Sequence, residues 1–143
     1  MKPDPTRILD RSADLLAGRI AGQLPTAHLA GTASLIALLM KFAARELESG
    51  AEIRHAENAQ MRALFGDIAQ TARDGDLRER LGAAAAEQQM SLTLSALDEA
   101  NAALKRLLID LHVHVEEAGD RKAQRRILEL LSRMASRRAV SIF

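Results

Sequence analysis

The chain has 143 residues, and its 20 Lys and Arg residues nearly balance its 19 Asp and Glu residues. This length favours one domain, and the near-zero net charge gives no reason to expect nucleic-acid binding by the whole molecule. Cysteine is absent, which excludes disulfides, thiolate zinc sites and cysteine nucleophiles. With 27 Ala, 22 Leu and only three Val residues, the composition favours helices over sheets.

Capping residues mark the first and the last helix. Asp4 is a good N-cap and is followed by Pro5, a residue that suits the first position of a helix. Near the other end, Gly119 stops one helix and Asp120 caps the next. We expect this last helix to run from about Arg121 to Arg138.

An uncharged run of 21 residues extends from Ile20 to Met40, which is long enough in principle to span a bilayer. Pro25 interrupts the run, and polar residues such as Gln23 and His28 make it only moderately apolar. The residues before it carry charges of both signs, unlike a secretory signal. We therefore expect a buried helix entered through a turn, no stable membrane span, and a cytoplasmic protein.

Apolar residues between Leu77 and Ala118 recur at alternating spacings of four and three, which is typical of a left-handed coiled coil. This stripe has a single polar member and consists of Met90, Leu94, Leu97, Asn101, Leu104, Leu108, Leu111 and Val115. No proline interrupts the segment. It predicts one helix over Leu77–Ala118.

A matching stripe runs from Ile36 to Ile68, with glycine, arginine and glutamate at its middle three positions. Gly50 could end one helix there and begin another. The unbroken phase of the stripe favours instead one helix from about Ala27 to Ala72.

The turn at Asp74-Gly75 would fold these two long helices back on each other, so that the numbers of facing residues sum to about 150. Gly50 would then face Asn101, and the polar interruptions of the two stripes would form one layer. Such a layer typically fixes the register of two helices. Coincidence is the alternative explanation.

Together these elements predict an all-α fold and one domain over residues 1–143, built on a long two-helix coiled-coil hairpin. The terminal helices are short and can cover only half of that hairpin. Residues 5–49 and 95–139 would form an antiparallel helical bundle at one end. The other half of the hairpin, about residues 51–94, would project as an arm.

The predicted arm carries more apolar side chains than two helices can bury. Exposed apolar patches usually mark contact surfaces, so we expect self-association as a homodimer through the arm. A helical protein partner is the other possible occupant. The predicted contact residues are Met61, Leu64, Phe65, Ile68, Leu77, Leu81 and Met90.

Glu52 and His55 have the spacing that puts a carboxylate and an imidazole on one helix face, as in ferritin-like di-iron bundles. The chain lacks the second such pair and the two further inward glutamates of those bundles, so Glu52 and His55 are weak candidates for a metal site. No convergent set of catalytic groups emerges. We expect neither an enzyme nor a bound cofactor.

Basic residues concentrate in the last helix. Residues 120–143 hold seven basic and two acidic residues. The predicted basic patch consists of Arg121, Lys122, Arg125, Arg126 and Arg133. Such a helix can dock on an acidic partner, an anionic membrane or nucleic acid, although cations near a helix C-terminus also stabilise the helix without any partner.

The sequence therefore predicts a non-enzymatic interaction protein of the adaptor type. Binding of an acidic surface or of nucleic acid through the basic helix is one alternative, with nucleic acid the less favoured ligand. A metal-binding helical bundle is the other.

Overall fold

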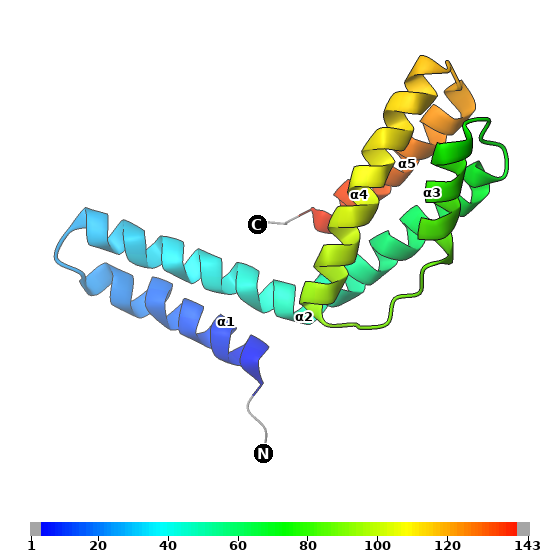
Figure 1. The fold of residues 1–143 in the computed structure, drawn as a ribbon. Coiled ribbons are helices and arrows are strands. Elements are labelled where there is room, and N and C mark those ends of the chain that lie inside the picture. The colour runs from blue at the N-terminus through cyan, green and yellow to red at the C-terminus, as the bar shows by residue number, and fades with distance from the viewer. Residues whose placement is uncertain (1–3, 140–143) are drawn as a thin grey trace. The chain divides into compact units, whose positions relative to one another are not determined.

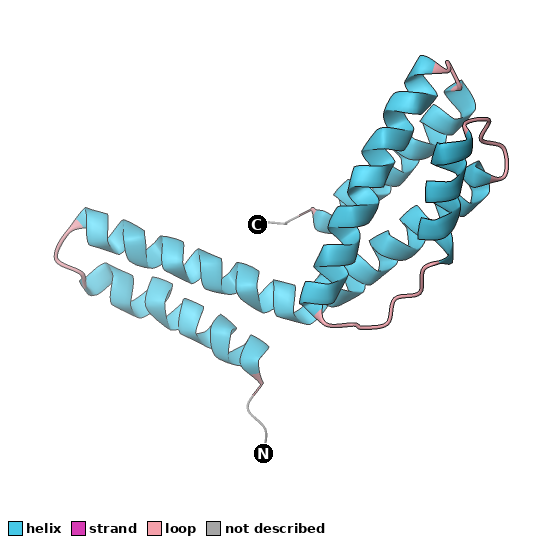
Figure 2. Cartoon of the chain, in the orientation of Figure 1, coloured by secondary structure: helices cyan, strands magenta, loops and turns pink. Residues whose placement is uncertain are grey.

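The computed structural model describes residues 4–139, which fold into helices with no strand among them (Figures 1 and 2). The α-helices are α1 (Pro5–Leu15), α2 (Ala27–Ala69), α3 (Gly75–Ala86), α4 (Leu94–Glu117) and α5 (Arg121–Arg138). Between α1 and α2 the chain forms a π-helical turn, Leu16–Ile20, and a 3-10 turn, Ala21–Gln23. The chain divides into two compact units, Met1–Ala51 and Glu52–Phe143.

The predicted helix ends are confirmed where capping residues mark them. The Asp4 carboxylate accepts a hydrogen bond from the amide of Thr6 at 3.0 Å, and the Asp120 carboxylate accepts one from the amide of Ala123 at 3.0 Å. Gly119 has a φ of 66°, in the left-handed region that glycine adopts at little cost. α5 has the limits that the sequence predicted.

α2 is one helix of 43 residues, and it runs through Gly50 without a break. The continuous phase of the apolar stripe predicted this continuity. The helix ends at Ala69, a few residues before the predicted end. Its first part belongs to the first compact unit, and residues 52–69 belong to the second.

The single helix predicted over Leu77–Ala118 is wrong. α3 ends at Ala86, α4 begins at Leu94, and residues 87–93 between them are irregular. Met90, counted as the first member of the heptad stripe, is 90% exposed in this connection.

The phase of the buried residues explains the break. Leu81 in α3 and Leu97 in α4 are both fully buried. They are 16 residues apart, so a continuous straight helix would point them about 160° away from each other. Such a helix could not bury both leucines against the same core.

The predicted turn at Asp74 does return α3 along α2. Asp74 caps α3 by accepting a hydrogen bond from the amide of Leu77 at 3.0 Å. A Cβ atom at Gly66 would lie 3.4 Å from the Cβ of Ala85, so the two helices approach closely there. These two residue numbers sum to about 150, as the antiparallel hairpin requires. The hairpin ends with α3.

α4 runs parallel to α2, not antiparallel to it as predicted. Arg54 Nε lies 2.7 Å from Asp98 Oδ1, and Asn101 Nδ2 lies 3.0 Å from Glu57 Oε2. Each pair is separated by 44 residues, and a constant difference in number identifies parallel helices. α3 and the 87–93 connection bring the chain back toward residue 52 of α2. α4 then begins near Arg54 and runs in the same direction as α2.

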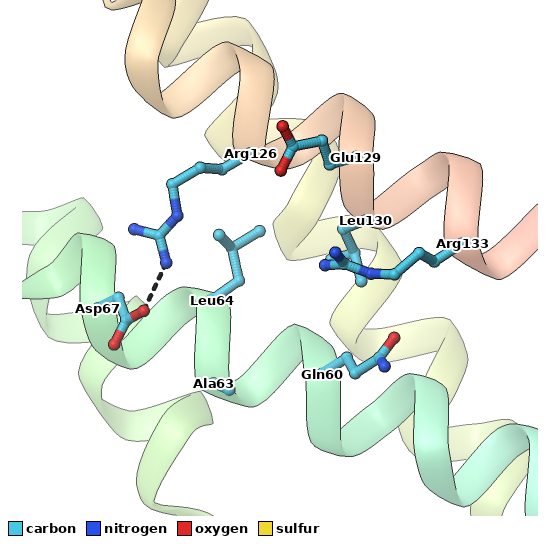
Figure 3. A pocket seen from close by; sticks show the side chains of 8 residues that line it. All are labelled: Gln60, Ala63, Leu64, Asp67, Arg126, Glu129, Leu130 and Arg133. Atoms are coloured by element: carbon cyan, nitrogen blue, oxygen red, sulfur yellow. Dashed lines mark hydrogen bonds and ion pairs between the residues drawn. The ribbon is translucent and has the colours of Figure 1, made fainter.

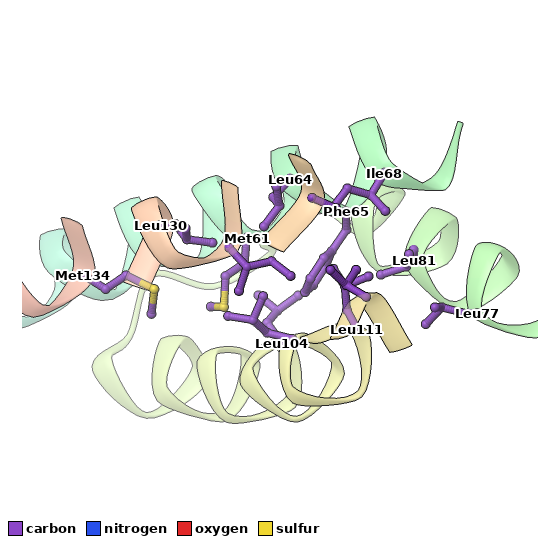
Figure 4. Packing of buried hydrophobic residues seen from close by; sticks show 14 residues of the cluster. Met61, Leu64, Phe65, Ile68, Leu77, Leu81, Leu104, Leu111, Leu130 and Met134 are labelled. Atoms are coloured by element: carbon purple, nitrogen blue, oxygen red, sulfur yellow. The ribbon is translucent and has the colours of Figure 1, made fainter. Parts of the chain in front are cut away.

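The hydrophobic core lies in the second unit (Figure 4). It combines side chains of α3, α4, α5 and the second part of α2, namely Met61, Leu64, Phe65, Ile68, Leu77, Leu81, Leu104, Leu108, Leu111, Val115, Ala123, Ile127, Leu130 and Met134. The expected arm over residues 51–94 is therefore wrong as a projecting element, because α4 and α5 cover its apolar residues.

Candidate functional site

The first unit is a helical hairpin in which α1 lies along the first part of α2 (Figure 1). Its buried hydrophobic residues are all small: Ala13, Ala21, Ala33, Ala37 and Ala44. Alanine lets two helices approach closely but buries little apolar surface. The fully buried part of the hairpin is therefore thin, and larger side chains such as Leu16, Met40 and Phe42 are only partly buried.

Large hydrophobic side chains of this hairpin point outward. Nine of them are at least 40% exposed: Ile8, Leu15, Ile20, Leu29, Leu35, Ile36, Leu38, Leu39 and Leu47. Scattered single leucines on a surface are ordinary, but a concentration of this size usually marks a contact surface.

Four of these residues form a continuous apolar face on α2. Spacings of seven and eleven residues bring Leu29, Ile36 and Leu47 onto one line of the helix, and Leu39 lies beside that line. We call these four residues the apolar face. Lys41 lies about 120–140° around the helix from this line.

An ion-pair cluster marks the opposite flank of the hairpin. Lys41 Nζ lies 2.8 Å from Asp14 Oδ1 and 3.5 Å from Asp10 Oδ1. The hydrogen bond that Lys41 donates to Asp14, together with the charges of both carboxylates, raises the pKa of Lys41 against the opposing effect of burial. The hairpin therefore has one charged flank and one apolar face.

By length and composition, α2 qualifies as a helix that could cross a membrane. Only 17% of its most apolar window is buried, so the expected buried helix over this run is wrong. The reason is that α1 covers one side only. Within the run, the hydroxyls of Thr32 and Ser34 donate to the carbonyls of His28 and Ala30, each at 3.0 Å.

A buried polar cluster links three helices of the second unit. Glu57 and Asn58 of α2 and Asn101 of α4 are almost completely buried. Asn101 Nδ2 donates to Glu57 Oε2 at 3.0 Å and to Asn58 Oδ1 at 2.8 Å. Arg138, the last residue of α5, donates to both Glu57 oxygens at 2.6 and 2.5 Å.

Asn101 is the polar member that the sequence singled out, and it does belong to a polar layer. The layer joins it to Glu57 and Asn58 rather than to Gly50, because α4 runs parallel to α2. Burial would raise the pKa of the Glu57 carboxyl, but hydrogen bonds from Arg138 and Asn101, with the charges of Arg138 and Lys105, bring that pKa below its ordinary value.

The predicted contact residues and metal candidates fall in different surroundings. Met61, Leu64, Phe65, Ile68, Leu77 and Leu81 are core residues, and Met90 alone of the seven is exposed. Glu52 and His55 are both exposed. Over residues 4–139, no group of three or more His, Asp and Glu side chains is placed to hold a metal ion.

The basic patch is divided between ion pairs and solvent. Arg126 Nη2 lies 2.5 Å from Asp67 Oδ2 of α2, whereas Arg121, Lys122 and Arg125 are exposed. Arg133 faces a cleft between α2 and α5.

This cleft encloses about 180 Å³ (Figure 3). Its lining residues are Gln60, Ala63, Leu64 and Asp67 of α2 with Arg126, Glu129, Leu130 and Arg133 of α5. The sequence pointed to the basic half of this cleft, but the α2 half depends on a pairing of helices that it did not reveal.

Comparison with known proteins gives no relative from which a function could be transferred. No family model matches the chain, and neither a curated protein nor a solved structure shows a significant match to it.

Proposed function

We propose that this chain is a non-enzymatic interaction protein that self-associates through the apolar face of its N-terminal hairpin. The observation that carries the proposal is the division of side chains in that unit. The fully buried hydrophobic side chains of the hairpin are alanines, whereas nine leucines and isoleucines are at least 40% exposed. Self-association was also expected from the sequence, but the surface proposed here is a different one.

A second copy suits this surface better than a lipid bilayer does. α1 and the turn after it carry Arg7, Asp10, Arg11, Asp14 and Arg19 within fifteen residues. An Arg or Asp at the centre of a membrane-spanning helix costs about 2.5 to 3.5 kcal/mol. A second copy can cover the apolar face of α2 and leave the charged flank of α1 in water.

The size of the surface also fits a dimer. The four residues of the apolar face are each about half exposed and leave a few hundred Å² of apolar surface, a patch of the size that usually marks a contact site on a soluble protein. Two such hairpins related by a two-fold axis would form an intermolecular four-helix bundle.

The first test replaces two residues of the apolar face. Size-exclusion chromatography with light scattering should give the unchanged protein about twice the chain mass of 15.6 kDa. The double variant Ile36→Glu, Leu39→Glu should elute at the chain mass, because two carboxylates in the interface would be desolvated without partners. The matched control is Ile109→Glu, Val113→Glu, which adds the same charges to exposed positions of α4 and should stay dimeric.

A second test does not depend on the folding of a doubly charged variant. Because the chain has no cysteine, a single Leu39→Cys replacement creates one reactive thiol. Mild oxidation should link two copies through position 39, and Ile109→Cys should give no comparable product. A monomeric unchanged protein, or equal cross-linking at both positions, would overturn the proposal. The proposal would also be overturned if the unchanged protein floated with phosphatidylglycerol vesicles and the Ile36→Glu, Leu39→Glu variant did not. The apolar face would then bind lipid.

A further inference from the structure

The cleft between α2 and α5 combines two arginines at its rim with an apolar floor. Leu64 and Leu130 form the floor, and both are almost fully buried, whereas Ala63 is exposed at the edge. Figure 3 shows the guanidinium groups of Arg126 and Arg133 on either side of Leu64 in this view. We propose that this cleft binds an acidic peptide segment that carries one aliphatic side chain.

Four cations share the face of α5 that includes the cleft. Spacings of four, seven and four residues place Lys122, Arg126, Arg133 and Arg137 near one line of the helix, over a length of about 22 Å. Two carboxylates, Asp67 and Glu129, are the acidic groups that line the cleft itself. The surplus of positive charge complements an acidic ligand.

Two polar groups of the cleft are left for a ligand. Arg126 is held by Asp67, but the Arg133 guanidinium makes no ion pair or hydrogen bond with any residue from 4 to 139. The Oε1 atom of Gln60 is buried and has no hydrogen-bond partner there. A buried acceptor without a partner carries a cost that a peptide N–H would relieve.

The chemistry of the floor favours a peptide over nucleic acid. Leu64 and Leu130 offer no polar partner to a phosphate, and the chain has no Trp or Tyr on which bases could stack. A peptide can place a carboxylate on Arg133, a backbone N–H on Gln60 Oε1 and an aliphatic side chain over Leu64 and Leu130. A cavity of about 180 Å³ has room for one such side chain.

The test uses the full-length protein and a defined probe. The probe is a fluorescein-labelled peptide with three glutamates on each side of a central leucine, and binding is followed by fluorescence anisotropy. Arg133→Glu should weaken binding at least tenfold, because it removes a charged hydrogen bond and adds a repulsive carboxylate. Arg125→Glu makes the same change of charge at an exposed arginine that does not line the cleft and lies about 80° around α5 from Arg133, so it should change affinity less than twofold.

Two further probes separate the floor from the rim. A peptide with serine in place of the leucine should bind several-fold more weakly, since it leaves the apolar floor uncovered. A labelled single-stranded DNA of similar length reports the nucleic-acid outcome. Absence of peptide binding, equal losses in Arg133→Glu and Arg125→Glu, or tighter binding of the DNA than of the peptide would each overturn the inference.

Discussion

Replacing Phe65 with alanine is expected to lower the free energy of unfolding by about 4 kcal/mol. Phe65 is completely buried in the core of the second unit, so the change removes a large apolar side chain and leaves a cavity. Urea unfolding followed by far-UV circular dichroism measures the loss. For a domain whose total stability is typically 5–15 kcal/mol, this is a large fraction.

Met90→Ala is the matched control for this experiment. Met90 was predicted with Phe65 as a contact residue, but it is 90% exposed, so its replacement should change stability by less than about 0.5 kcal/mol. The loss in Phe65→Ala should also be independent of protein concentration, because the contacts of Phe65 lie within one chain. A loss below about 1 kcal/mol, or one that grows on dilution, would contradict this core. If Phe65→Ala does not fold, Phe65→Leu should lose only about 1 kcal/mol.

The second large effect is expected at the buried polar cluster. Glu57→Ala should cost about 3 kcal/mol, because breaking a buried ion pair leaves the partner charge without compensation. The Arg138 side chain is 36% exposed, which places the cost at the lower end of the range for buried pairs. Glu99→Ala, an exposed carboxylate of α4, is the control and should change stability little.

A double-mutant cycle with Arg138→Ala isolates the pair itself. The sum of the two single losses in stability should exceed the loss in the double variant by about 1–2 kcal/mol, because Arg138 donates two hydrogen bonds to Glu57. Additive losses would mean that the two side chains do not interact in solution.

The same cluster predicts a pH dependence with a definite sign. The pKa of Glu57 is lowered in the folded chain, so its contribution to stability is complete above the ordinary carboxyl pKa of about 4.3 and is lost as the pH falls through the lower folded value. The stability difference between the unchanged protein and Glu57→Gln should therefore shrink between about pH 5 and pH 3. A difference that stays constant over this interval would contradict the assignment.

Local signals in the sequence predicted the helix ends well. Asp4, Gly119 and Asp120 act through contacts with residues two or three positions away, so their effect can be read without knowledge of the fold. The continuity of α2 through Gly50 is also a local property, because it depends on the phase of one stripe.

The direction of α4 could not be obtained in the same way. The heptad stripe reaches back to Met90, but Leu77 and Leu81 do not lie on it. That offset in phase was the available signal that the helix breaks between Leu81 and Leu97. A single helix without the break at residues 87–93 would lie antiparallel to α2. Every residue of α4 would then face a different residue of α2 from the one it contacts in the structure.

The candidate sites were predicted to different extents. Asn101 was identified as a buried polar residue from its place in an apolar stripe. Its partner Glu57 was counted as an interruption in the other stripe, because only the parallel pairing places the two side chains together. The apolar residues of the N-terminal hairpin were expected to be buried, and only the structure shows that alanines occupy the seam instead.

The parallel pairing of α2 and α4 imposes an order on folding during synthesis. The face of α2 that bears Phe65 leaves the ribosome before α4 does, since α3 and the 87–93 connection lie between them in the chain. α3 is the first element able to shield that face, through its short hairpin with α2. Before α4 and α5 have been made, Leu77 and Leu81 of α3 are therefore the first later side chains that can cover part of that face.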